Sequence, residues 1–228
     1  MENPTEDLRD RLLDAALAHV PFDGWSEATF RAAVSDTGAE MAAARSVCPR
    51  GAVDLALLYH RRGDEEMRRR LRAANLLDLR FRDRVAAAVR FRIESITDKE
   101  AVRRGSALFS LPQYAADGVK AIWGTADAIW EALGDTSDDY NWYTKRATLS
   151  GVYSSTVLYW LGDESEGHAA TWDFLDRRIE DVMRFEKLKA DLREKPGLSR
   201  LMQGPGAILS RIRAPGAPRT DLPGRILR

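Results

Sequence analysis

Apolar residues recur three and four positions apart along most of this chain, a spacing that predicts helices. One such stripe consists of Phe81, Val85, Val89, Ile93 and Ile96. No stretch alternates apolar and polar residues cleanly beside turn-forming residues, as a half-buried strand would. The pattern therefore predicts an all-α fold, with helices over residues 6–20, 27–37, 39–47, 50–62, 81–96, 99–111, 112–133, 141–161 and 169–194.

Several ends of these helices carry residues that cap or stop a helix. Ser26 and Asp98 precede periodic segments and are suited to accept hydrogen bonds from the first backbone N–H groups. Gly38 and Gly134 follow the last periodic residues, where a left-handed residue commonly ends a helix. The segment Pro-Phe-Asp-Gly-Trp at 21–25 is expected to interrupt the first helix.

The bulk composition is that of an ordinary globular protein, with 44% hydrophobic residues, 31% charged residues and zero net charge. No run of 18 apolar residues is present, so no membrane-spanning segment is expected. The single cysteine, Cys48, fits a reducing compartment, and residues 1–17 lack the features of a secretory or transit peptide. We therefore expect a cytoplasmic protein, peripherally associated with the inner face of a bacterial cytoplasmic membrane.

The side chains that common catalytic sites require do not occur at the necessary spacings. No Gly-rich loop follows a strand, which argues against the usual nucleotide-binding fingerprints. The three histidines, His19, His60 and His168, lack the Glu-x-x-His spacing of helical diiron sites, and one cysteine adds no zinc-ligand pattern. Cys48 and His60 have no third, orienting group, so Cys48 is better interpreted as a small buried hydrophobe. No catalytic residue, metal site or cofactor is predicted.

The composition changes at Pro196, and residues 196–228 form a separate basic tail. Residues 195–228 hold seven basic residues and one acid, Asp221, interspersed with aliphatic residues. Such a mixture favours an amphipathic helix on a membrane surface, whereas the Gly-Pro-Gly at 204–206 favours a disordered tail. Both interpretations stay open. The candidate membrane-binding residues are Leu201, Met202, Ile208, Leu209, Arg211, Ile212 and Arg213.

Residues 6–62 resemble the N-terminal domain of TetR-type regulators. The matching features are the segment Asp-Ala-Ala-Leu-Ala-His-Val at 14–20, the turn with Gly24, the Thr-Phe pair in the second helix and a short third helix. That third helix, residues 39–47, would be the one that contacts bases, yet it holds one cation, one anion and four alanines. It lacks the donors that direct readout needs, so a TetR-like shape that does not bind nucleic acid is favoured.

The second half resembles the ubiquinone-biosynthesis accessory proteins of the coenzyme Q nine family. The resemblance rests on Asn-Trp-Tyr-Thr-Lys-Arg-Ala at 141–147, followed by Leu149, Val152, Tyr153 and Thr156. It continues through Asp163 and the segment 171–183, over about 60 residues. The resemblance implies a TetR-like N-terminal domain over 1–72, a helical ligand-binding domain over 73–195 and the tail over 196–228. It also implies a homodimer.

The function that the resemblance implies is a non-catalytic one. Such a protein binds isoprenoid quinone intermediates, including demethoxyubiquinone, and presents them to a diiron demethoxyubiquinone hydroxylase at a phospholipid membrane. Carried onto this sequence, the hydroxylase-binding patch falls on Leu133, Asp139, Trp142, Tyr143 and Arg146. The alternative function is that of a TetR-type DNA-binding regulator with a hydrophobic effector. A small helical enzyme that acts on a lipid is a third possibility, which the missing catalytic constellations disfavour.

Two groups of aromatic residues are candidates for these sites. A polyprenyl pocket needs apolar and aromatic lining with few polar anchors, which Trp123, Trp130, Tyr153, Trp160 and Trp172 could supply; an ordinary core is the other interpretation. Trp142 and Tyr143 are neighbours at a helix start, where successive side chains point about 100° apart. One of the two must therefore leave the core face, either to pack under the preceding polar loop or to anchor a partner.

Overall fold

The chain folds into a helical protein, for which we describe a computed structural model over residues 4–76, 78–194 and 213–214. Within these ranges all regular structure is helical, which confirms the predicted all-α class. The helices are α1 (Pro4–Asp23), α2 (Glu27–Thr37), α3 (Met41–Val47), α4 (Ala52–Ala73), α5 (Phe81–Glu94), α6 (Lys99–Phe109), α7 (Ala115–Ala132), α8 (Tyr140–Gly162), the 3₁₀ turn η1 (Glu166–His168) and α9 (Ala169–Glu194).

The predicted caps are present at four helix ends. The Ser26 side chain accepts a hydrogen bond from the N–H of Thr29, and the Asp98 carboxylate accepts from the first turn of α6. Gly38 and Gly134 adopt positive φ angles of 64° and 79° just beyond α2 and α7. These local hydrogen bonds and backbone conformations explain why the sequence located these boundaries closely.

Three other helix boundaries differ from the prediction by three residues or more. α1 passes through Pro21 and ends at Asp23, because a proline so near the end of a helix removes only one of the last backbone donors. α4 does not stop at residue 62 but continues to Ala73. Glu66 on this extension pairs with both Arg69 and Arg70 one turn later, which stabilises the arginine-dense segment as a helix. α7 begins at Ala115, three residues after Pro112.

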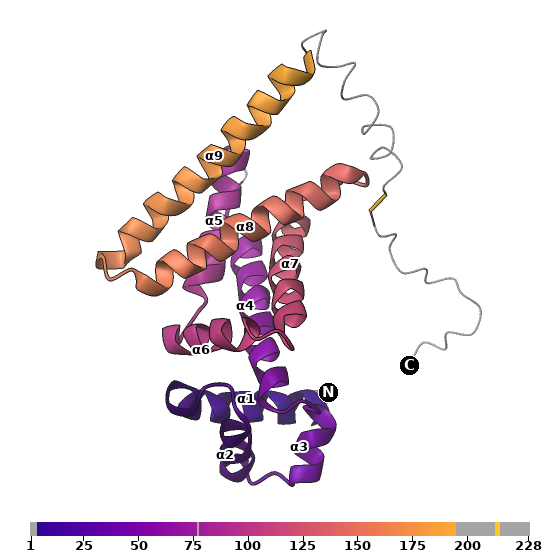
Figure 1. Cartoon of the computed structure of the whole chain (residues 1–228), viewed down its shortest axis with the longest axis vertical. Helices are drawn as coiled ribbons and strands as arrows, with labels where there is room; N and C mark the ends of the chain where they lie inside the picture. The colour runs from indigo at the N-terminus through magenta and orange to yellow at the C-terminus, as the bar shows by residue number, and fades with distance from the viewer. Residues whose placement is uncertain (1–3, 77, 195–212, 215–228) are drawn as a thin grey trace, which may run out of the picture.

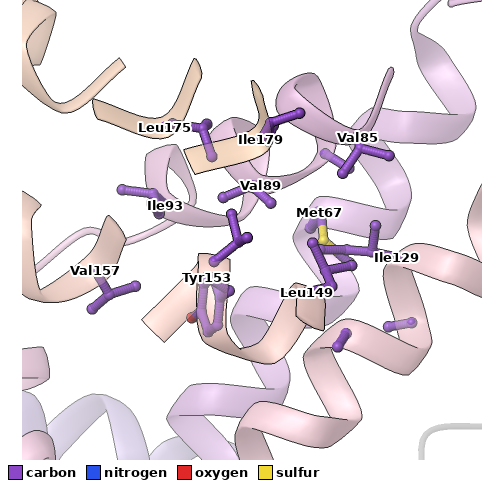
Figure 2. Packing of buried hydrophobic residues seen from close by; sticks show 14 of the residues in the cluster. Met67, Val85, Val89, Ile93, Ile129, Leu149, Tyr153, Val157, Leu175 and Ile179 are labelled. Atoms are coloured by element: carbon purple, nitrogen blue, oxygen red, sulfur yellow. The ribbon is translucent and has the colours of Figure 1, made fainter. Parts of the chain in front are cut away.

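Two clusters of buried residues make up the interior. The N-terminal core joins α1, α2, α3, the first half of α4 and Ala101 of α6; it contains Leu12, Leu13, Ala16, Val20, Trp25, Phe30, Ala33, Val34, Ala44, Cys48, Ala52, Leu55, Ala56 and Ala101. The C-terminal core joins the second half of α4 to α5, α7, α8 and α9; Figure 2 shows Leu175 and Ile179 of α9 beside Val85 and Val89 of α5. One helix, α4, therefore belongs to both cores.

The arrangement of the helices follows from this shared α4 (Figure 1). α1, α2 and α3 lie at one end, and α4 runs from them toward α5, α7 and α8. α6 lies across the junction and contacts both α1 and α7. α8 and α9 meet at η1 and form the opposite end. Of the described helices, none combines the length and the apolar character that crossing a bilayer requires.

Candidate ligand cavity and aromatic surface

A cavity of about 600 Å³ lies where the two cores meet. Its walls come from α4, the end of α5, α6, α7 and α8, with Leu17 of α1 and Trp25 on the N-terminal side. Most of the lining is apolar, as in Ala56, Ile96, Val102, Phe109, Ile122 and Val157. A largely apolar cavity of this size is in the usual range for sites that bind small molecules.

One wall of the cavity carries a buried polar network. The Arg92 Nε donates to the Asp64 carboxylate at 2.6 Å, and the Arg92 NH2 group donates to the carbonyl oxygen of His60 at 2.9 Å. The Thr125 hydroxyl donates to the same Asp64 oxygen at 2.8 Å. Arg92 and Asp64 are 3% and 7% exposed, so each charge depends on the other for its stability in the interior.

The hydrogen bonds of this network determine which nitrogen of His60 holds the proton. The Asp64 carboxylate can only accept hydrogen bonds. The Thr125 hydroxyl therefore donates its single proton to Asp64. It must then accept a hydrogen bond from His60 Nε2, which lies 2.8 Å away. The carbonyl oxygen of Ala121, 3.2 Å from Nε2, is a second acceptor. His60 therefore carries its proton on Nε2. Burial, and then the charge of Arg92, lower the His60 pKa to about 4, so the ring is neutral at pH 7.

Two polar groups on the wall beside this network can serve a ligand. Neutral His60 has a lone pair on Nδ1, which has no hydrogen-bond partner among the described residues. Tyr153, which also lines the cavity, is 4% exposed, and in the described part of the chain its hydroxyl makes no hydrogen bond either. Figure 2 shows the Tyr153 ring within the C-terminal core, and the Arg92 guanidinium lies 5.7 Å from its centroid. His60 and Tyr153 thus offer one acceptor and one hydroxyl on a wall of the largely apolar cavity.

Gly63 is what allows Arg92 to enter this wall. A Cβ atom at residue 63 would lie 2.6 Å from the guanidinium carbon of Arg92, far inside van der Waals contact. The glycine sits in the middle of α4, where it would otherwise weaken the helix. Its position is therefore explained by the side chain that passes over it.

The mouth of the cavity is marked by two apolar side chains. Val119 of α7 and Leu158 of α8 line the cavity, yet they are 67% and 64% exposed. Large apolar side chains with such exposure are unusual unless something covers them. A long apolar ligand that enters the cavity would pass along this pair.

The structure places one of the five predicted lipid-binding aromatics, Tyr153, on the cavity wall. Trp160 is buried beside Lys99 and His168, and Trp172 donates to the Gly167 carbonyl and lies under Arg90. Trp130 stacks on Phe81 and Trp123 contacts Trp142 and Tyr143. The cavity-facing side of α7 bears Gly118, Val119 and Ile122, and the next residue, Trp123, is turned about 100° away from Ile122.

The cavity also contains residues that sequence reasoning missed. Trp25 and Tyr59 contribute aromatic lining from the N-terminal half, and the Trp25 Nε1 donates to the Ala101 carbonyl oxygen at 3.0 Å. From the sequence, Trp25 is only the last residue of the helix-interrupting segment at 21–25. Nothing in the spacing of residues 25, 59 and 153 could have shown that they line one cavity.

A second feature is an aromatic surface at the start of α8, which we call the aromatic corner and define as Trp123, Trp142 and Tyr143. The Trp142 and Tyr143 rings meet edge to face with centroids 4.8 Å apart, and Trp123 lies 5.9 Å from Trp142. All three residues are partly exposed. The neighbours on α8 therefore point toward a tryptophan of α7 at the surface, and neither belongs to the buried clusters.

Arg146 lies beneath this corner and not on its surface. Its guanidinium donates to Asp127 at 2.5 Å and to Asp135 at 3.0 Å, and it is only 2% exposed. Burial alone would raise the Asp135 pKa, but hydrogen bonds from Lys145, Ser137 and Arg146 lower it to about 2. Among the other predicted partner-binding residues, Asp139 caps α8 at an exposed position and Leu133 is half-buried against the C-terminal core.

The predicted membrane-binding residues lie outside the described residues, with the exception of Arg213. The carbonyl oxygen of Arg213 accepts a hydrogen bond from the Tyr143 hydroxyl at 3.1 Å. Arg213 is therefore next to the aromatic corner.

The one cation of the short third helix is already engaged. Arg45 on α3 forms an ion pair with Glu27 of α2, and its guanidinium lies 4.5 Å from the centroid of the Phe30 ring. Both contacts are with residues of α2. That α3 does not contact DNA stays a prediction from its composition.

Comparison with known proteins gives the same two resemblances as the sequence motifs. The COQ9 family model matches residues 115–186, which include the aromatic corner and the C-terminal half of the cavity. Curated relatives are the mitochondrial ubiquinone biosynthesis protein COQ9 of Rattus norvegicus, 32% identical over 78% of this chain, and that of Drosophila melanogaster, 30% identical over 79%. The chain is related to the COQ9 family.

The COQ9 relatives are longer than the matched region. This chain spans 59% of the Rattus norvegicus protein and 58% of the Homo sapiens protein, to which it is 30% identical. The names of these relatives describe them as mitochondrial, which contradicts the expected location at a bacterial cytoplasmic membrane. That expectation was wrong because a single cysteine and the composition of residues 1–17 do not identify one compartment.

The solved structures support the fold of this COQ9 relative. A TetR transcriptional regulator from Nitrosomonas europaea superposes with a TM-score of 0.63, covering 76% of this chain and 97% of the regulator at 19% sequence identity. This similarity confirms the predicted TetR-like fold. At such low identity it concerns the fold alone.

Proposed function

We propose that the protein is a non-catalytic, lipid-binding accessory factor in ubiquinone biosynthesis. In this proposal it holds an isoprenoid quinone intermediate, such as demethoxyubiquinone, and presents it to the partner diiron hydroxylase. The observation that carries the proposal is the cavity of about 600 Å³ with its apolar lining and two available polar groups. The names of the COQ9 relatives supply the pathway.

The chemistry of the cavity suits a quinone with an apolar tail. The Tyr153 hydroxyl can donate to a ring carbonyl, and the His60 Nδ1 lone pair can accept from a ring hydroxyl. Buried polar groups that gain a partner on binding give specificity for the head group. The tail would fill the apolar part of the cavity and leave between Val119 and Leu158.

The aromatic corner is the proposed contact for the hydroxylase. Tryptophan and tyrosine are the residue types that most often dominate binding energies at interfaces, and Trp123, Trp142 and Tyr143 present three such rings together. The structure changes the role that we propose for Arg146: it holds Trp142 from below and does not contact the partner itself. Asp139 remains a candidate contact because it is exposed beside Trp142.

The proposal also includes a homodimer and three regions of the chain. Tyr159 of α8 is 40% exposed and stacks on Phe174 of α9 with centroids 4.5 Å apart. A second copy that covers this pair of rings would remove apolar surface from water. Light scattering should then give twice the mass of the chain. The proposed regions remain 1–72, 73–195 and the basic tail 196–228, which we propose to contact phospholipid.

The lipid content of the purified protein is the most direct test of the proposed function. We expect mass spectrometry of extracted lipids to find an isoprenoid quinone or a precursor. Ile122→Trp, which fills the cavity, should abolish the bound lipid, whereas Met183→Trp at an exposed position of α9 should leave it unchanged. Similar lipid content in both variants, with unchanged melting temperatures, would place the lipid elsewhere. Turnover of a quinone precursor by the protein without any partner would contradict the non-catalytic role.

A further inference from the structure

Two residues that follow α9 at a distance in sequence lie against the start of α8 (Figure 1). The N–H of Ala214 donates to the carbonyl oxygen of Asp138 at 2.9 Å. The Tyr143 hydroxyl donates to the carbonyl oxygen of Arg213 at 3.1 Å. The Arg213 guanidinium also lies 3.6 Å from the Asp138 carboxylate. These contacts attach the segment Arg213–Ala214 to the loop between α7 and α8.

The hydrogen bonds to the main chain account for most of this attachment. The Arg213 and Asp138 side chains are 76% and 81% exposed, and ion pairs between such exposed groups contribute little. The other two contacts involve backbone atoms of Arg213 and Ala214, so they fix the position of the backbone and not of a particular side chain. The carbonyl oxygen of Arg213 and the N–H of the next residue, Ala214, both have hydrogen-bond partners. Two satisfied backbone groups in succession are not expected of a segment with random contacts.

Covalent attachment makes such a small contact effective. Residues 195–212, which are 18 in number, join the segment to the end of α9. A short connection of this kind keeps the tethered group at an effective concentration of about the millimolar range. Tethering therefore favours these two hydrogen bonds over the same contacts made by a free dipeptide.

We propose that Arg213–Ala214 is a self-docking segment that covers the Tyr143 side of the aromatic corner and competes with a partner for it. The Tyr143 hydroxyl is engaged by the carbonyl of Arg213, so a partner that needs this hydroxyl must displace the segment. The self-docking itself rests only on the contacts described above. The competition rests on the proposed role of the aromatic corner in hydroxylase binding.

Hydrogen exchange at the Ala214 amide tests the self-docking in the full chain. Tyr143→Phe removes the hydroxyl and keeps the ring, so we expect the Ala214 amide to exchange about two- to tenfold faster. Tyr140→Phe is the matched control, because the Tyr140 hydroxyl makes no hydrogen bond in the part of the chain that is described. Equal exchange in the wild type and both variants would overturn the self-docking.

Binding of the purified diiron hydroxylase, measured by calorimetry, tests the competition. Ala214→Pro removes the N–H that donates to Asp138 and leaves the aromatic corner unchanged. Ala217→Pro is its control, since both alanines precede a proline in the tail. We expect Ala214→Pro alone to tighten binding about two- to tenfold.

The outcomes separate this inference from the proposed function. Equal affinities in the wild type, Ala214→Pro and Ala217→Pro would overturn the competition. If the hydroxylase bound to none of the three proteins, the proposed partner would be wrong and the competition with it. The exchange experiment would still decide whether the segment docks.

Discussion

The guanidinium carbon of Arg146 lies 4.0 Å from the centroid of the Trp142 ring, one turn along the same helix. The same guanidinium bonds to Asp127, to Asp135 and to the carbonyl oxygen of Trp142. Arg146 therefore links the buried ion-pair network of the α7–α8 loop to the exposed rings above it. Planar stacking and several hydrogen bonds at once suit arginine and not lysine.

Replacing Arg146 should destabilise the protein strongly. Arg146→Ala would leave the buried Asp135 without one of its partners, and breaking a buried pair costs about 3–5 kcal/mol. Thermal or urea unfolding measures this loss. Arg184→Ala, which removes an exposed pair with Glu180, should cost less than about 0.5 kcal/mol. Equal effects of the two substitutions would show that the Arg146 network contributes nothing beyond a surface pair.

The aromatic corner should matter more for hydroxylase binding than for stability. Trp142→Ala and Tyr143→Ala are each expected to weaken binding by about 2 kcal/mol, which is typical of interface hot spots. Both side chains are partly exposed, so the melting temperature should change less than it does for a core residue. Trp172→Ala on α9 is a control: it should lower stability without affecting binding. Parallel losses of binding and stability at residues 142 and 143 would favour a purely structural role.

The buried His60 should make stability depend on pH. Its pKa is about 4 in the folded protein and about 6.5 when unfolded, so the unfolded chain binds more protons between these values. The contribution of neutral His60 to the free energy of unfolding is fully present above pH 6.5 and falls by about 2 kcal/mol by pH 5. His60→Gln should flatten this part of the curve, whereas Met183→Leu at an exposed position of α9, which changes no titratable group, should not. Urea unfolding between pH 7.5 and 5 gives the comparison, and identical slopes in all three proteins would contradict the role of His60.

A pair of glycine substitutions tests the packing of Arg92. Gly63→Ala places a methyl group 2.6 Å from the Arg92 guanidinium carbon, so we expect a loss of about 1–3 kcal/mol from overpacking and disruption of the network. Gly124→Ala in the interior of α7 meets no atom within 4 Å and should raise stability by up to about 1 kcal/mol. Denaturant unfolding of both variants measures whether each substitution lowers or raises the free energy of unfolding. A stabilising Gly63→Ala would mean that Arg92 does not pass over residue 63.

The helices were largely predictable because their signals are local. The 3.6-residue periodicity, the N-caps Ser26 and Asp98 and the glycines at 38 and 134 depend on interactions within one or two turns. The prediction failed at the end of α4, where Glu66 pairs with Arg69 and Arg70 past residue 62. This part of the helix also packs through Met67 and Leu71 into the C-terminal core, a tertiary contact that the local pattern does not show.

The candidate site was predictable only in part. The family motif at 141–147 located the aromatic corner, and Tyr153 was the one predicted lipid-binding residue that reached the cavity wall. Arg146 was placed on the right element but with the wrong exposure, because its partner Asp135 lies in a loop whose path the sequence does not define. Helical spacing groups tryptophans on one face of a helix but does not show which face a cavity occupies.

The sequence by itself determined the all-α class, most helix ends and the likeness to the COQ9 family, because periodicity, capping and motifs act over short separations. Only the tertiary structure decided where the cavity lies. Its wall joins Trp25, His60 and Tyr153 from separate helices and loops, and its polar network needs Asp64 and Arg92 to meet across 28 residues. Such meetings depend on how the helices pack, and packing depends on the shapes of all the buried side chains together.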